Sequence, residues 1–145
     1  MEIRKKALGF SSLVKSQGPE MLLKNLGLKA TKQRQRALSI LYENGGPMTV
    51  ESMISKIDID PGTLYRILEV FEKVSLVRKI DFREKSFFYE INNMHHHHIV
   101  CKSCKDIEEI DICGIEKIIP WSKKFSNIFE HSLEFFGICK TCSKS

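Results

Sequence analysis

The side chains best suited to metal chemistry in this chain are four paired cysteines. Cys101 and Cys104 are separated by two residues, and Cys139 and Cys142 repeat this spacing after a further 34 residues. Each C-x-x-C turn places two sulfur atoms on one side of the backbone, so two turns can complete a tetrahedral, all-thiolate zinc site. A disulfide within each pair is the alternative. The concentration of four of the five cysteines in this motif favours metal, and with it a reducing compartment.

Four consecutive histidines, at residues 95–98, stand shortly before the first cysteine pair. Imidazole nitrogens bind zinc, iron, manganese, nickel or copper, and they titrate near neutral pH. One chain therefore combines the ligands of a closed, structural site with those of a more open one. This combination indicates a metal-responsive protein.

Composition and charge restrict the class of protein. No run approaches ~18 apolar residues, so no membrane span is expected. The basic N-terminus is not followed by a long apolar core, so no signal peptide is expected. Residues 1–80 hold 14 Lys and Arg against 8 Asp and Glu, while residues 81–145 hold 9 against 10. A basic half joined to a ligand-rich half favours a nucleic-acid module followed by a sensing or assembly module.

Apolar spacing in the first half predicts a winged helix-turn-helix. Thr31 and Thr49 are expected N-caps, and Pro61 is expected to start the third helix of the motif. The expected elements are a basic arm over 1–18, a helix from 20 to 26, helices over 32–44, 50–57 and 62–74, and strands over 76–81 and 86–91 with a wing tip at 83–85.

The second half is predicted to form a small α/β domain. Its expected elements are a strand over 106–111, a helix from 114 to about 127 and a last strand over 131–137. The fold class is therefore α+β. The predicted segments are an N-terminal extension over 1–18, a winged-helix DNA-binding domain over 19–92 and a metal-binding domain over 93–145.

The helix expected over 62–74 is the candidate DNA-reading element. In a helix-turn-helix the second helix lies in the major groove, and its N-terminal residues reach bases and phosphates. Arg66 suits a phosphate or a guanine, Tyr65 suits a thymine methyl, and Thr63 stands beside them. The alternative is a solvated helix face with Tyr65 half-buried. Further basic residues that suit phosphates flank the start of an earlier helix: Lys29, Lys32, Arg34 and Arg36.

Four motifs, in order, resemble the ferric uptake regulator family over roughly residues 20–142. They are LGLKATKQR at 26–34, TLYRIL at 63–68, HHHHxxCxxC at 95–104 and CxxC at 139–142. The resemblance implies a cytoplasmic, homodimeric transcriptional repressor that is not an enzyme and has no small organic substrate. It implies metal-dependent binding to a palindromic operator in double-stranded DNA, control of metal (chiefly iron) uptake or homeostasis genes, and dimerisation through the second domain.

The resemblance also implies three metal sites and a set of DNA contacts. The structural zinc would be held by Cys101, Cys104, Cys139 and Cys142. A regulatory site at the hinge between the domains, binding Fe²⁺, Zn²⁺ or Mn²⁺, would use Glu90, His96, His98 and Glu109. In the family, the position of Glu109 supplies a carboxylate ligand either to this hinge site or to a second site in the dimerisation domain. The second site of the dimerisation domain would use His95, His97, Glu116 and His131, and the DNA contacts would be Lys29, Thr63, Tyr65 and Arg66.

Three departures from the family pattern bear on these sites. Family members often supply a hinge-site histidine just before the second predicted helix, where this chain has Gly46-Pro47-Met48-Thr49. The recognition helix begins Pro61-Gly62, without the usual Ala or Ser before its Thr, and the N-terminal extension is longer and more basic than in compact members. Cys113, which belongs to neither pair, is expected to be a small, buried apolar residue.

Several other functions remain open at this point. Within the family they are zinc-uptake, manganese and peroxide-sensing regulators, of which the last is disfavoured because Glu90 and Glu109 are not aspartates. A metallohydrolase is an alternative outside the family, since an open His/Glu site can activate water; the chain lacks an HExxH helix. A zinc-binding protein-interaction module is another, and the basic first half argues against it.

Overall fold

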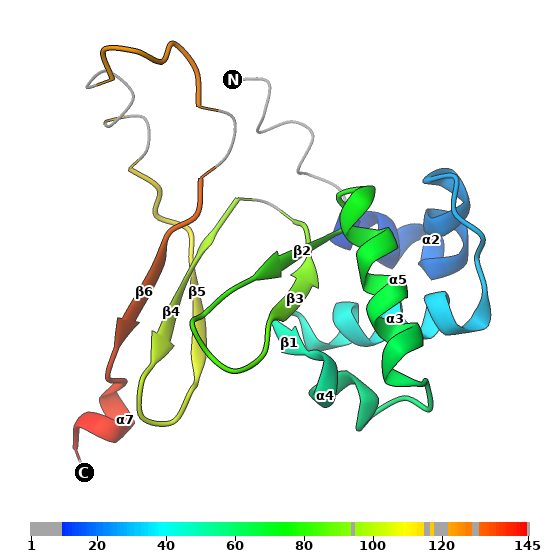
Figure 1. The fold of residues 1–145 in the computed structure, drawn as a ribbon, viewed down its shortest axis with the longest axis horizontal. Coiled ribbons are helices and arrows are strands. Elements are labelled where there is room, and N and C mark those ends of the chain that lie inside the picture. The colour runs from blue at the N-terminus through cyan, green and yellow to red at the C-terminus, as the bar shows by residue number, and fades with distance from the viewer. Residues whose placement is uncertain (1–9, 94, 115–116, 118–121, 129–130, 145) are drawn as a thin grey trace. The chain divides into compact units, whose positions relative to one another are not determined.

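The computed structural model describes residues 10–93, 95–114, 117, 122–128 and 131–144. The chain divides into two compact units, the first ending at residue 94 and the second beginning at His95. Figure 1 shows that the first unit is largely helical and that the second is built on a sheet. Within the described ranges, no helix has the length and apolar character needed to cross a membrane.

The helices described in the first unit include one that reaches into the predicted N-terminal arm. They are α2 (Phe10–Asn25), α3 (Lys32–Asn44), α4 (Val50–Ile54) and α5 (Pro61–Lys73). α2 bends at Gly18, whose φ is +74°, and Pro19 follows. Glycine accepts positive φ without a steric penalty, and proline has no backbone N–H to donate. Val14, which precedes the bend, packs into the core of the first unit.

Capping residues set the bounds of α3. Thr31 Oγ1 accepts a hydrogen bond from the Arg34 backbone N–H at 3.3 Å. At the other end Gly45 takes a left-handed conformation with φ +68°, and its N–H bonds to the carbonyl of Leu41. The predicted range of this helix, 32–44, is confirmed at both ends.

The start of α5 is fixed by a carboxylate. Asp60 Oδ2 accepts a hydrogen bond from the Thr63 N–H at 3.0 Å, and Pro61 occupies the first turn, where its missing N–H costs nothing. The preceding helix, α4, is capped by Thr49 as predicted. It ends at Ile54, three residues earlier than predicted, in a tight turn.

A three-stranded antiparallel sheet completes the first unit. Its order is β1-β3-β2, with β1 at Met48–Thr49, β2 at Val77–Ile80 and β3 at Phe88–Ile91. β2 and β3 form the predicted hairpin, whose loop is the wing, and the unpredicted β1 ties the start of α4 to β3. Helices α3, α4 and α5 followed by this hairpin are a winged helix-turn-helix, which confirms the predicted fold of this half.

One continuous apolar core fixes the orientation of α5. Leu64, Leu68 and Phe71 are fully buried against α3, which contributes Leu38 and Leu41. Each buried side chain of this size stabilises the fold by about 1.5–3 kcal/mol. The opposite face of α5, which carries the candidate DNA contacts, is therefore held toward solvent.

The second unit is a three-stranded sheet followed by a short helix. β4 (His97–Cys101) pairs antiparallel with β5 (Ile107–Ile110) and parallel with β6 (Glu134–Gly137), and α7 (Lys140–Ser143) follows. The sequence predicted β5 and β6, although with longer ranges, but it predicted neither β4 nor α7. The histidine run shows no apolar alternation, and it becomes a strand because it has a partner on each side.

The helix predicted from 114 to about 127 is wrong over its last part. Residues 122–128 are irregular, and the Ser122 side chain accepts a hydrogen bond from the Phe125 N–H at 3.0 Å. Such a local bond competes with helix formation. Residues 115–116 and 118–121 lie outside the described residues.

Candidate metal centres and nucleic-acid interface

The four predicted zinc ligands come from two turns that the sheet places together. Cys101 ends β4 and Cys104 lies in the turn toward β5, while Cys139 caps α7 and Cys142 lies within it. The parallel pairing sets Cys101 opposite Gly137, so the second turn begins beside the first. All four sulfur atoms lie within 4.8 Å of one another.

The spacing of these sulfur atoms fits a tetrahedral zinc ion. Cys104 Sγ and Cys139 Sγ are 3.7 Å apart. A tetrahedron with Zn–S bonds of about 2.3 Å has sulfur–sulfur edges of about 3.8 Å, whereas a disulfide bond is only about 2.05 Å long. The five cysteines are free thiols, so the alternative of a disulfide within each pair is not what the structure contains.

Backbone hydrogen bonds already prepare one sulfur of this cluster as a ligand. The Cys139 N–H donates to Cys101 Sγ at 3.3 Å, and together with the backbone N–H groups of Cys104 and Ser103 it lowers the pKa of the Cys101 thiol to about 6. For Cys104 the Asp106 N–H lowers the pKa, but hydrogen bonds shared with the Cys101 and Cys142 thiols outweigh it and raise the pKa to about 12. Metal binding releases the protons that such a cluster shares, because thiolates are the ligands.

A second group in this unit consists of His96, His98 and Glu109. His98 lies directly opposite Glu109 in the β4–β5 pair, and His96 Nε2 is 3.9 Å from Glu109 Oε1. The centroids of the two imidazole rings are 4.8 Å apart. Both histidines are buried and the glutamate is exposed. Two nitrogen ligands and one carboxylate suit Fe²⁺, Zn²⁺ or Mn²⁺.

The fourth predicted hinge ligand, Glu90, lies in the first unit on β3. Its side chain is buried, and Arg78, directly opposite on β2, donates from Nε to its carboxylate. Arg78 was not predicted as a partner of Glu90, although the register of the predicted hairpin sets the two residues opposite each other. The segment where the resemblance led us to expect a histidine is Gly46-Pro47-Met48-Thr49, and its last two residues form β1.

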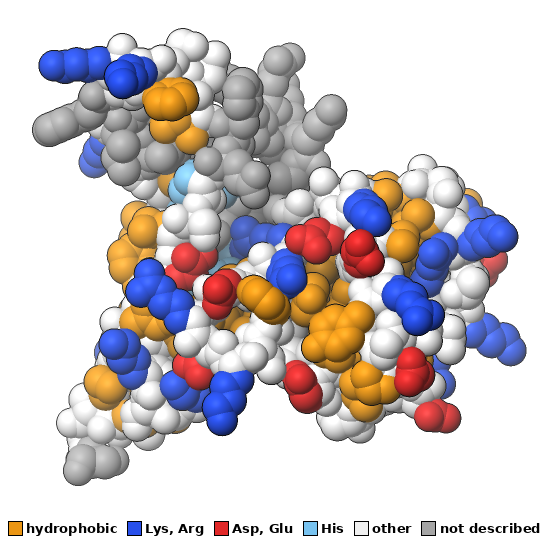
Figure 2. All heavy atoms as spheres, viewed as in Figure 1, with side chains coloured by type: hydrophobic (Ala, Val, Ile, Leu, Met, Phe, Trp, Pro, Cys, Tyr) orange, Lys and Arg blue, Asp and Glu red, His pale blue; other side chains and the backbone are white. Residues whose placement is uncertain are grey.

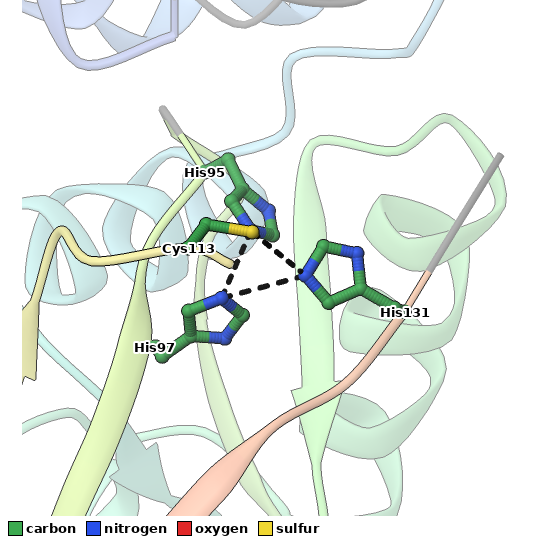
Figure 3. A group of neighbouring side chains, drawn as sticks. All are labelled: His95, His97, Cys113 and His131. Atoms are coloured by element: carbon green, nitrogen blue, oxygen red, sulfur yellow. Dashed lines mark hydrogen bonds between the residues drawn. The ribbon is translucent and has the colours of Figure 1, made fainter. Parts of the chain in front are cut away.

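A third group gathers His95, His97 and His131, with Cys113 in addition (Figure 3). The expectation that Cys113 is a buried apolar residue is wrong, because the residue is half-buried and its Sγ lies 3.3 Å from His131 Nε2. No local sequence signal indicated this contact, because Cys113 and His131 are 18 positions apart. Glu116, the fourth ligand predicted for this group, lies outside the described residues.

Three of the four predicted DNA contacts line one open groove on the first unit. They are Lys29, Thr63 and Arg66, whereas Tyr65 does not line it. Arg34 lines it too, and its guanidinium donates to the Lys29 carbonyl at 3.0 Å, which fixes the loop that carries this lysine. Tyr65 is 47% exposed on α5, which leaves its ring accessible to DNA and is equally what the alternative of a half-buried tyrosine on a solvated face predicts.

The Pro61-Gly62 start of α5 has a local cause. A Cβ added at Gly62 would lie 3.2 Å from Asp60 Oδ2, the carboxylate oxygen that caps the helix. The glycine therefore leaves room for the cap. Lys and Arg side chains are spread among Asp and Glu over the helical part of the face in Figure 2, so this face is not uniformly basic.

Comparison with known proteins gives consistent matches. The sequence profile of the Ferric uptake regulator family matches residues 25–136. The Ferric uptake regulation protein of Staphylococcus epidermidis is 34% identical over 130 residues, covering 86% of this chain and 94% of that protein. The Peroxide-responsive repressor PerR of Staphylococcus saprophyticus is 24% identical over 127 residues, covering 83% and 86%. The structure of the ferric uptake regulator Fur of Helicobacter pylori, which has three functional metal binding sites, matches with a TM-score of 0.75 and 27% identity, covering 96% of this chain and 97% of that one.

Proposed function

This chain belongs to the ferric uptake regulator family of metal-responsive transcriptional repressors, and we propose that it represses genes for metal uptake, chiefly iron uptake, by binding a palindromic DNA operator when a regulatory metal is bound. The family predicted from the four sequence motifs is thereby confirmed. The family profile spans residues of both units, so the assignment covers the DNA-binding and the metal-binding parts of the chain alike.

The observation that carries the proposal is the groove shared by Lys29, Thr63 and Arg66. These residues were selected from the sequence as DNA contacts, and they come from two separate elements of the first unit. In a winged helix the N-terminal half of α5 enters the major groove, where Arg66 bonds to a phosphate or a guanine. Lys29 and Arg34 then lie where they neutralise phosphates beside it.

The regulatory metal is proposed to bind His96, His98 and Glu109, with Glu90 as a ligand from the first unit. Ligands drawn from both units would fix the DNA-binding units at the separation that the operator requires, as a population shift and not as a new fold. The first 94 residues contain no histidine, so the carboxylate of Glu90 is the ligand we assign to that unit. The three ligand groups among the described residues parallel the three functional metal binding sites of the Helicobacter pylori relative.

We propose that the chain acts as a homodimer formed through the second unit. Ile99 and Phe135 are paired in register on β4 and β6, and both are exposed, as is Leu133 two residues before Phe135. An exposed apolar strip of this kind suits an interface between two copies. Two-fold symmetry then explains a palindromic operator. We propose that the protein acts in the cytoplasm, and the free thiols and the proposed DNA target support this location.

The test is metal content per chain and DNA affinity, measured before and after dialysis against a moderate chelator. The duplex is selected from a random library by the metal-loaded protein, because the operator is not known in advance. We expect one zinc to be retained and a second metal to be lost together with DNA affinity. Unchanged DNA affinity after loss of the second metal would overturn the proposed regulation.

Two matched pairs of variants separate the two parts of the proposal. Arg66→Ala is expected to reduce DNA affinity strongly, whereas Lys73→Ala, at the other end of the same helix and outside the groove, is expected to reduce it little. Glu109→Gln is expected to weaken the regulatory metal, whereas Glu108→Gln, next to it on the strand, is not. If both variants of a pair have equal effects, Arg66 is not a specific DNA contact or Glu109 is not a metal ligand, respectively.

A further inference from the structure

We propose that Cys113 is a metal ligand, and that with His95, His97 and His131 it forms a second tetrahedral zinc site in the second unit. In this site a thiolate takes the place that the family resemblance gave to the carboxylate of Glu116. The inference concerns metal binding by the free protein, and it does not rest on the proposed role in DNA binding.

The topology of the second unit brings these four residues to one edge of its sheet. His97 begins β4 and lies opposite Ile110, the last residue of β5. Cys113 follows three residues later, so it returns to the same edge. β6 runs parallel to β4, so its start also lies at this edge, and His131 comes just before it. His95 precedes His97 by two residues and points to the same side (Figure 3).

The distances match a metal site in size. His95 Nε2 is 3.0 Å from His97 Nε2, and His131 Nε2 is 3.4 Å from His97 Nε2 and 3.3 Å from Cys113 Sγ. A tetrahedral zinc ion with Zn–N bonds of about 2.05 Å and a Zn–S bond of about 2.3 Å has ligand–ligand edges of about 3.3–3.6 Å. The four ligand atoms all lie within 4.8 Å of one another, so their spacing is already close to that of a tetrahedral zinc site.

Hydrogen bonding among the side chains explains this arrangement less well. The Nε2 of a neutral imidazole carries either one proton or one lone pair, so it makes one good hydrogen bond. His97 Nε2 faces both other histidine nitrogens, and His131 Nε2 faces both His97 and the sulfur of Cys113. Protons can satisfy only some of these contacts. One cation at the centre satisfies all four ligand atoms together.

A sulfur ligand changes which metal the site prefers. Carboxylate oxygen suits Mn²⁺ and Fe²⁺, while thiolate and imidazole together suit Zn²⁺. A thiolate also neutralises half the charge of a divalent ion, which matters in a half-buried site. This site is therefore expected to hold zinc more tightly than manganese or iron, whichever metal fills the regulatory site.

Cobalt spectroscopy tests the proposal directly. The full-length protein, with zinc retained in its four-cysteine site, is titrated with Co²⁺ under anaerobic conditions while zinc release is followed with an indicator. Without zinc release, we expect a sulfur-to-cobalt charge-transfer band and the strong visible bands of tetrahedral cobalt. Co²⁺ uptake without a charge-transfer band would overturn the proposal.

Two variants test whether the charge-transfer band arises from the sulfur of Cys113. Cys113→Ser is expected to abolish the charge-transfer band and to weaken Co²⁺ at least about tenfold, because even loss of an outer-shell partner of a metal ligand typically costs 10–100-fold in affinity. Glu116→Gln is expected to leave the band unchanged. A Cys113→Ser protein with the wild-type spectrum, or loss of the site in Glu116→Gln alone, would show that the carboxylate is the ligand.

The same variants measure selectivity. In competition between Zn²⁺ and Mn²⁺, Cys113→Ser is expected to reduce the preference for zinc, while the four-cysteine site keeps its zinc in every variant. An unchanged preference would mean that the sulfur does not coordinate. Because no DNA is present, failure here leaves the proposed repressor function untouched, and failure of DNA binding leaves this site untouched.

Discussion

The two units of this chain bury very different side chains. The first unit has a continuous apolar core that runs from α2 to β3 and includes the fully buried Leu38 and Phe71. In the second unit, the buried hydrophobic residues among those described are Val100 and Cys101. The other buried side chains described there are three imidazoles, at residues 96–98.

This difference shows that the two units are stabilised by different interactions. Among the described residues of the second unit, three short strands bury little apolar surface, which the hydrophobic effect alone stabilises only marginally. Candidate metal ligands take up much of the buried interior that they share. We therefore expect the fold of the second unit to depend on metal and that of the first unit to persist without it.

The largest expected effect is loss of the fold of the second unit when the four-cysteine site is broken. Structural zinc contributes about 10 kcal/mol or more of folding free energy in small zinc domains. In Cys104→Ser, amide hydrogen exchange is expected to show full loss of protection in β4, β5 and β6, with α3 and α5 still protected. Ser103→Ala, in the same turn, is the control. If the strands stay protected in the zinc-free variant, the second unit does not depend on zinc for its fold, and the proposed difference between the two units is wrong.

A cavity in the apolar core should destabilise the first unit and leave the second unit folded. Phe71→Ala is expected to destabilise that unit by about 3–5 kcal/mol, measured by urea unfolding of the helical circular dichroism signal, while zinc content stays constant. Phe87→Ala is the matched control, because Phe87 is exposed and its ring mainly packs under Lys79 Nζ, 3.9 Å from its centroid. That contact contributes about 0.5–1 kcal/mol. Loss of zinc in Phe71→Ala would show that the units do not fold independently.

A smaller effect is expected at the start of α5. Asp60→Ala removes the acceptor for the Thr63 N–H and is expected to cost about 1 kcal/mol of the stability of the first unit. Asp58→Ala, also exposed but outside the capping hydrogen bond, is expected to change stability by less than about 0.5 kcal/mol. Thermal unfolding of both variants measures the difference. If the two are equally stable, Asp60 does not act as the cap.

The sequence predicted best what local interactions decide. Thr31 and Gly45 bound α3 through bonds within four residues, so the range of that helix followed from the sequence. The β2–β3 hairpin followed from two apolar runs around a polar turn. The four cysteines could be grouped because their spacing alone indicates a metal site.

What the sequence did not predict depends on partners far along the chain. β4 is a strand because β5 and β6 flank it, and nothing in four histidines favours a strand over a connector. β1 has only two residues, too short for an alternating pattern. The neighbours of Cys113 could not be identified because His131 is 18 residues away, and only the folded sheet brings the two together.

The parallel pairing of β4 with β6 has a consequence for the order of folding. Cys101 and Cys139 are 38 positions apart, and bringing such distant segments together costs chain entropy before any strand contact forms. Each C-x-x-C turn is local and can capture zinc early, after which the ion holds the ends of the two strands together. The first unit also joins distant segments, where β1 pairs with β3, but no cysteine pair lies at that junction. The refolding rate of the second unit should therefore rise with zinc concentration, while that of the first should not change.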